Sequence, residues 1–126
     1  MRSFLISIIL LTCIISFCVL SACFVSNRVT HTELLLEKAL MLQNQKQSEQ
    51  AARQVKTAAE YWNKSQVYFG TILQHDEVDS VGEEMARLEA YARSEDQDDF
   101  LSNCAGLLAK LHHIREMEWP FIFNIL

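Results

Sequence analysis

An uninterrupted apolar run near the N-terminus constrains this chain more than any other feature. Residues 4–25 read FLISIILLTCIISFCVLSACFV, without a charged residue, Pro or Gly, and 14 of these 22 residues are Leu, Ile, Phe or Val. As a helix, the run extends about 33 Å, which is enough to cross a hydrocarbon core of about 30 Å. The run therefore predicts a transmembrane helix that contacts membrane lipid through residues 4–25.

Three interpretations of this run are open. The first, which we favour, is an uncleaved signal anchor with residues 1–3 in the cytoplasm and the remaining chain outside the cell membrane. The second is a cleaved secretory signal, which would need an apolar stretch of only about 7–15 residues and a small-residue cleavage site after it. The third is a lipoprotein signal, because Leu20-Ser21-Ala22-Cys23 resembles the bacterial lipobox, in which Cys23 would carry the lipid.

Composition predicts an all-α fold. The chain has three Gly and one Pro, and it is rich in good helix formers. Cys104 is the only cysteine after residue 25, so the sequence predicts no internal disulfide framework. Residues 65–126 carry a net charge of −8, against +3 for residues 1–64. The acidic half disfavours nucleic-acid binding, which needs clustered Lys and Arg.

Apolar spacing predicts three helices after the span. The first covers about residues 32–73, with Thr30 and Glu33 as a capping box at its start. Its polar run at residues 43–50 (QNQKQSEQ) has no apolar face and suggests a solvated stalk or a flexible linker. Helices at about residues 77–92 and 97–118 follow, the last ending at Trp119-Pro120 because proline disfavours helix in the residue before it.

Short connections favour antiparallel neighbours, so the expected fold is an up-down three-helix bundle with a long first helix. The expected divisions are a cytoplasmic head at residues 1–3, a signal anchor at 4–25, a membrane-proximal stalk at 26–50 and a bundle domain at 51–126. The predicted core of the bundle is Val55, Trp62, Phe69, Val81, Leu88, Leu107, Leu111 and Ile114.

Two groups of residues are candidates for function. Imidazole and carboxylate ligands suit a divalent metal, so His75 and Asp79 with His112 and His113 form a possible metal site, although Asp79 is also explained as a helix-start residue. The C-terminal residues 119–126 (WPFIFNIL) are unusually apolar for a chain end. The candidate contact residues in this segment are Trp119, Phe121, Phe123 and Leu126.

Several landmarks together resemble one protein family. They are the N-terminal span, Trp62 in the first long helix, an acidic turn with His75, Asp76, Glu77 and Asp79, and the ending Asn124-Ile125-Leu126. This pattern resembles an uncharacterised family of small membrane-anchored proteins of Gram-positive bacteria, filed as a domain of unknown function. The resemblance implies an anchored helical domain and no established activity.

The sequence favours a binding or accessory module over an enzyme. It contains no G-x-S-x-G, no Gly-rich phosphate loop and no H-E-x-x-H motif. We expect a membrane-anchored extracytoplasmic helical module without catalytic activity or cofactor, which binds an integral-membrane protein or itself. The alternative function is an envelope metal-binding or ligand-sensing protein that uses His75 with His112 or His113.

Overall fold

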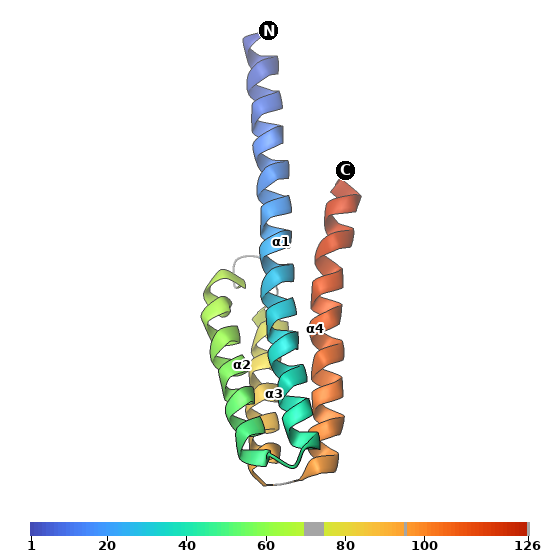
Figure 1. Ribbon diagram of the computed structural model, residues 1–126. Helices are drawn as coiled ribbons and strands as arrows, with labels where there is room; N and C mark the ends of the chain where they lie inside the picture. The colour runs from blue at the N-terminus through green and yellow to red at the C-terminus, as the bar shows by residue number, and fades with distance from the viewer. Residues whose placement is uncertain (70–74, 95, 126) are drawn as a thin grey trace.

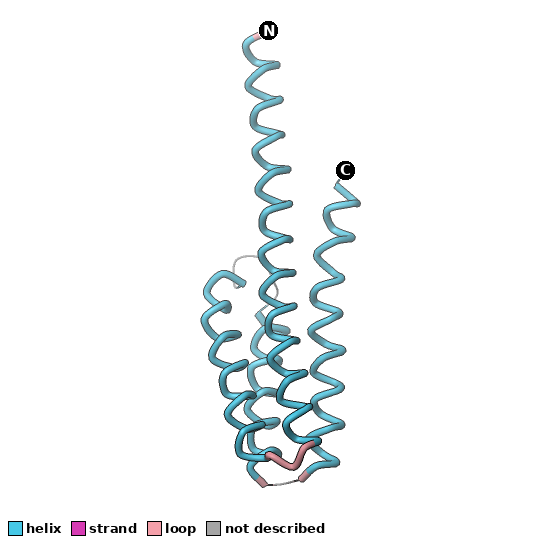
Figure 2. Tube along the Cα trace, in the orientation of Figure 1, coloured by secondary structure: helices cyan, strands magenta, loops and turns pink. Residues whose placement is uncertain are grey.

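The computed structural model describes residues 1–69, 75–94 and 96–125, and for His75 and residues 118–125 it describes only the backbone. Four helices make up the described chain (Figures 1 and 2): α1 Arg2–Asn44, α2 Ser48–Phe69, α3 His75–Arg93 and α4 Gln97–Ile125. Each helix packs against the next along the chain, and α4 returns to pack against α1. The all-α expectation, with a long apolar helix at the N-terminus, is therefore confirmed.

The bundle has two different ends (Figure 1). We call the end with the α1–α2 and α3–α4 connections the tip, and the end where α1 leaves the bundle the base. Both chain termini lie beyond the base, with the N-terminus farther out. The termini share one side because an even number of antiparallel helices brings the chain back to where it started.

The first helix does not end where the sequence suggested. The stalk predicted at residues 26–50 and the helix predicted at 32–73 are both wrong, because α1 runs from the apolar run to Asn44 and turns at residues 45–47. Val29 and Leu36 are fully buried, so this part of α1 is a bundle helix and not a stalk. The bundle accordingly has four helices where three were expected.

A left-handed C-cap produces this turn. Lys46 has φ 60°, its N–H donates to the carbonyl of Gln43 (3.0 Å), and the N–H of Gln47 donates to the carbonyl of Leu42 (3.0 Å). This pair of bonds satisfies carbonyls at a helix end, and glycine usually occupies the left-handed position. Because a lysine and not a glycine occupies this position, the sequence does not predict that the helix ends here.

The interior of the bundle matches the predicted core. All eight predicted residues are at most 1% exposed. The largest of them, Trp62, packs its ring 4.9 Å from that of Phe69, and its Nε1–H donates to the carbonyl of Val78 (3.1 Å). α1, which was not predicted to take part in the bundle core, adds Val25, Val29, Leu36 and Ala39 to it.

The two halves of α1 differ in their surroundings. From Ala22 onwards, one face of the helix is buried against the bundle. Before Ala22, no residue is classed as buried, and large apolar side chains such as Phe4, Ile9 and Leu20 are 63–70% exposed. One half of α1 thus belongs to the core of the bundle, and the other half projects from the base without a partner in the described chain (Figure 1).

The last helix is longer than predicted. α4 passes through Pro120 and ends at Ile125, so the expected end near Glu118 is wrong. A proline inside a helix removes only one hydrogen bond, here the bond that its own N–H would donate to the carbonyl of Glu116, and its ring crowds the same carbonyl. These local penalties did not stop the helix, which continues beyond the ends of α2 and α3 (Figure 1).

Candidate binding site at the tip of the bundle

The predicted metal ligands do not gather in the described part of the chain. Asp79 on α3 and His113 on α4 are exposed, and the side chain of His75 lies outside the description. His112 lies within 3.0 Å of Glu116 and 2.6 Å of Arg115, both on its own helix. Among the described residues, no three His, Cys, Asp or Glu side chains are placed to share a metal ion.

The other candidate residues lie towards the base. Trp119, Phe121 and Phe123 are in the last turns of α4, where only the backbone is described, and Leu126 lies outside the described residues. Cys23 is an exposed free thiol on α1, one residue after the first buried position. The lipid-attachment alternative for Cys23 stays a prediction.

Cys104 is a core residue. It is fully buried on α4, and its Sγ lies 4.0 Å from the carbonyl oxygen of Leu36. Burial raises the pKa of the Cys104 thiol to about 11, with a smaller contribution from the charge of Glu37. A thiol with this pKa is almost entirely protonated at neutral pH and is a poor nucleophile.

A polar cluster that sequence reasoning missed joins α1 to α4. Arg115 donates to Glu33 (3.1 Å) and to the hydroxyl of Thr30 (3.2 Å). The predicted capping box is thus wrong, since Thr30 and Glu33 lie in the middle of α1. Desolvation raises the pKa of Glu33, and the positive charge of Arg115 opposes this shift without cancelling it. We call this cluster the Arg115 clasp.

Two buried side-chain oxygens lack a hydrogen-bond partner among the described residues, Glu33 Oε1 in the Arg115 clasp and Gln43 Oε1 at the tip. Gln43 is only 3% exposed, and its Oε1 has no hydrogen-bond partner in the described protein. Buried amide oxygens in native proteins are nearly always paired, so an unpaired one requires an explanation. Together with Lys46, Ser48 and Gln97, Gln43 lines a polar pocket of about 210 Å³. A hydrogen-bond donor bound in this pocket would lie against Gln43.

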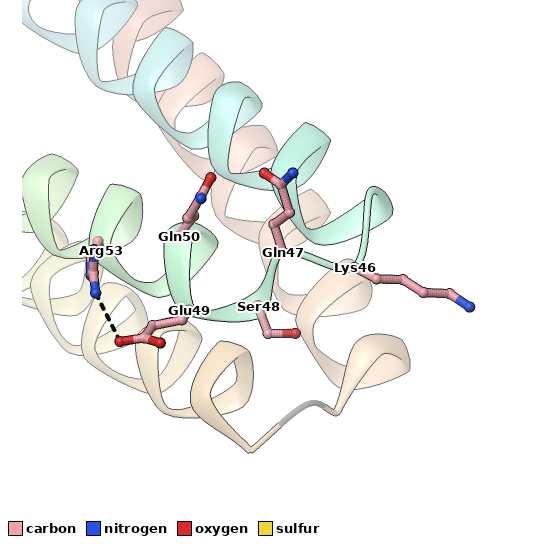
Figure 3. A pocket seen from close by; sticks show the side chains of 6 residues that line it. All are labelled: Lys46, Gln47, Ser48, Glu49, Gln50 and Arg53. Carbon is pink, nitrogen blue, oxygen red and sulfur yellow. Dashed lines mark hydrogen bonds and ion pairs between the residues drawn. The ribbon is translucent and has the colours of Figure 1, made fainter.

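Two further pockets adjoin this one, and all three share Ser48. The larger, of about 360 Å³, lies along the α1–α2 turn and the start of α2 (Figure 3). The other, of about 260 Å³, reaches across to Ala92 and Arg93 at the end of α3. The six residues that line the larger pocket are Lys46, Gln47, Ser48, Glu49, Gln50 and Arg53.

Hydrogen bonding dominates the chemistry of the tip. Figure 3 shows Lys46 extending away from the bundle, and Arg53 paired with Glu49 at 2.9 Å. Arg93 is likewise paired with Glu89 at 3.1 Å. At the start of α4, the carboxylate of Asp96 accepts a hydrogen bond from the N–H of Asp99 (3.3 Å). With most charges paired, amides and hydroxyls remain available to a ligand.

The fold and these surfaces define a class of protein: a small antiparallel four-helix bundle whose first helix continues outwards as a long apolar helix. The chain belongs to the family described as Domain of unknown function (DUF4363), whose model matches residues 19–125. The family domain therefore comprises the bundle and the few residues of α1 that lead into it. No curated protein matches the chain, and neither does any solved structure.

Proposed function

We propose that this protein is a membrane-anchored accessory module without catalytic activity, which holds the tip of its bundle at a fixed height above the membrane for a protein partner. The observation that carries the proposal is the continuity of α1. Its exposed apolar half is long and apolar enough to cross a membrane, a property that signal sequences share. This half leads into the bundle half without a break in the helix. A helix without Pro or Gly contains no sequence element that would kink it here.

Helix geometry sets the height. About 20 residues of α1 separate the end of the apolar run at Val25 from the turn at residues 45–47. At about 1.5 Å per residue, the tip would stand about 30 Å above the hydrocarbon boundary. Because α2 and α4 pack against this part of α1, the height would vary little. Such a fixed reach suits a subunit that contacts the extracytoplasmic part of an integral-membrane partner.

The proposed orientation places the bundle outside the cell. It rests on the short head, in which Arg2 and the α-amine precede the long apolar run as in an export signal. The test is labelling of an introduced thiol at the tip, Gln47→Cys, with a membrane-impermeant maleimide on intact cells. Labelling without lysis supports this orientation, whereas labelling that requires lysis would reverse it.

The partner surface is proposed to be the tip, and the support is the combination of three adjoining pockets with the buried, unpaired Gln43. A partner that inserts a polar group into the pocket of about 210 Å³ would lie against the wall that Gln43 lines. Left-handed Lys46 adds support, because strained backbone conformations concentrate at functional sites.

In-cell photo-crosslinking tests this surface. A photoreactive amino acid replaces Gln47 at the tip or, as the matched control, Arg87 on the exposed face of α3. We expect one defined adduct with an integral-membrane protein from position 47 and none from position 87. The Gln43→Met variant, which keeps the side-chain volume but removes the amide, should weaken that adduct. Equal adducts from both positions, or an adduct unaffected by Gln43→Met, would refute the role of the tip.

A further inference from the structure

The end of α4 forms a second apolar feature at the base. After Glu118 the chain carries no further charged side chain, and residues 119–125 read WPFIFNI. The backbone of these residues is helical and continues α4 outwards from the base (Figure 1). An apolar helix end that projects beyond its own bundle needs an apolar environment, since its exposure to water is unfavourable.

The Arg115 clasp fixes the level of this segment relative to α1. Arg115 lies opposite Thr30 and Glu33 on an antiparallel neighbour. Ten residues further along α4, at Ile125, the helix has advanced about 15 Å towards the N-terminal side of α1. The same advance along α1 leads from residues 30–33 to about residues 20–23. Residues 119–125 of α4 therefore lie at the same height in the bundle as about residues 21–28 of α1.

The hydrocarbon boundary falls within this level. If the apolar core begins at Phe4, next to Arg2, a thickness of about 30 Å corresponds to about 20 residues of helix. The far boundary then lies near Phe24. Trp119 would lie at the headgroup side of this boundary, and Ile125 would lie inside the hydrocarbon.

The neighbouring residues at the base have the composition of a membrane interface. Tyr68, at the end of α2, lies beside Phe24, with ring centroids 5.5 Å apart. Arg28 lies over the rings of both Phe24 and Tyr61, at 5.1 and 4.9 Å. Val67 is 78% exposed and Tyr68 is 57% exposed. Aromatic residues with a nearby cation are typical of the headgroup level of membrane proteins.

We propose that the base of the bundle is a lipid-binding surface, at which residues 119–125 of α4 enter the outer leaflet beside α1. This inference rests on the membrane anchor of the proposed function and adds a second, shallow membrane contact to it. It also accounts for the helix beyond Pro120, because backbone groups in hydrocarbon have no water to bond with and stay helical. Lipid is the partner of this segment, because the end of the segment lies at the height at which acyl chains surround the anchor helix.

The two tryptophans of the chain make the inference measurable. Trp62 is fully buried in the bundle, whereas Trp119 begins the proposed lipid-contacting segment. The full-length protein is reconstituted in phosphatidylcholine–phosphatidylglycerol vesicles that contain lipids brominated at defined acyl positions. The fluorescence of the Trp119→Phe variant, which retains only Trp62, is subtracted from that of the intact protein to isolate Trp119. Phenylalanine keeps an aromatic ring at position 119, and the far-UV circular dichroism of the variant is compared with that of the intact protein to check the bundle.

We expect bromine near the glycerol end of the acyl chains to quench the Trp119 component by about half or more, as for other interfacial tryptophans. The emission of Trp62 in the Trp119→Phe variant should be unaffected. Aqueous iodide should quench neither component strongly.

Flotation of the same vesicles separates failure of the anchor from failure of this inference. If the protein does not float with lipid, both the anchor and the second contact are refuted. If it floats but iodide rather than bromine quenches Trp119, the segment lies in water and only this inference is overturned. If it floats and neither agent quenches Trp119, protein covers the segment, which refutes lipid as the occupant and indicates self-association.

Discussion

Replacing Arg115 by Met should destabilise the bundle, and the loss should depend on pH. The substitution keeps an apolar stem but removes the guanidinium that joins Glu33 and Thr30 to α4. The Glu33 side chain is 15% exposed and that of Arg115 is 25% exposed. Loss of one partner from a fully buried pair costs about 3–5 kcal/mol, and the partial exposure here lets water compensate for some of it. We expect a loss of about 1–2 kcal/mol at pH 7.

The pH dependence follows from the raised pKa of Glu33. Burial is the main cause of the shift, and Glu37 adds to it, whereas Arg115 and His112 act in the opposite direction. In the folded protein, Glu33 therefore holds its proton to a higher pH than in the unfolded chain. Its contribution to stability is fully present below its unfolded pKa of about 4.3 and is lost as pH rises through the folded value. Loss of Arg115 raises the folded pKa further, so the variant should suffer most at neutral pH.

Thermal unfolding in mild detergent, followed by far-UV circular dichroism, measures this effect. At pH 7, a loss of about 1–2 kcal/mol in a domain of about 100 residues lowers Tm by about 5–10 °C. Near pH 4 the difference from the parent should shrink to a small fraction of this. Comparing variant and parent at each pH removes most of the contribution of other titrating groups.

Glu33→Gln is the matched control for this reasoning. It removes the negative charge of Glu33, for which the free-energy cost of burial exceeds the gain from pairing with Arg115. At neutral pH this variant should therefore leave Tm nearly unchanged or raise it slightly. In the Glu33→Gln background, Arg115→Met should cost less than in the parent at pH 7. A loss from Arg115→Met that is the same at pH 4 and pH 7, or a Glu33→Gln variant as unstable as Arg115→Met, would refute the argument.

Three further outcomes are expected. Lys46→Gly should stabilise the bundle by about 0.5–1 kcal/mol, because glycine adopts the left-handed conformation without the steric cost that lysine bears; an unchanged or lower denaturation midpoint would contradict this cap. Gly106→Ala should raise stability by up to about 1 kcal/mol, since a Cβ there meets no atom within 4 Å and alanine is the better helix former; a loss in the same assay would show hidden crowding. The Cys104 thiol should resist iodoacetamide at pH 8 in the folded protein and react after unfolding, as measured by mass spectrometry of its peptide; rapid alkylation of the folded protein would contradict its burial and its pKa of about 11.

Periodicity along the chain predicted the core because burial on a helix repeats every three to four residues. The predicted core residues Val55, Trp62 and Phe69 are all among the residues that α2 buries. The helix predicted at residues 77–92 differs from α3 by only one or two residues at each end. The ion pairs between Glu49 and Arg53 and between Glu89 and Arg93 join residues four positions apart on one helix. All these features depend on residues within a few turns of one another, which a single sequence displays directly.

Features that depend on contacts between helices escaped sequence reasoning. The polar run at residues 43–50 contains no Gly or Pro, so nothing in it marked the turn that Lys46 makes. Arg115 and Glu33 are 82 positions apart, and only the register between α1 and α4 brings them together. Gln43 looked like one more amide in a solvated segment, and its burial follows only from the return of the chain at the tip. The candidate binding site therefore required the structure.

The distribution of apolar residues along α1 explains how one helix serves two environments. Before Ala22 its apolar side chains surround the axis, which is the pattern of a helix that meets acyl chains on every side. From Ala22 to Gln43 one face is buried against the bundle, although Leu34 and Met41 on the other side are each 57% exposed, so this part of the helix meets protein on one side only. The change falls where the family match begins, at residue 19. Because the helix continues through this change without a break, its exposed apolar half and its bundle half form one continuous element that ends at the tip.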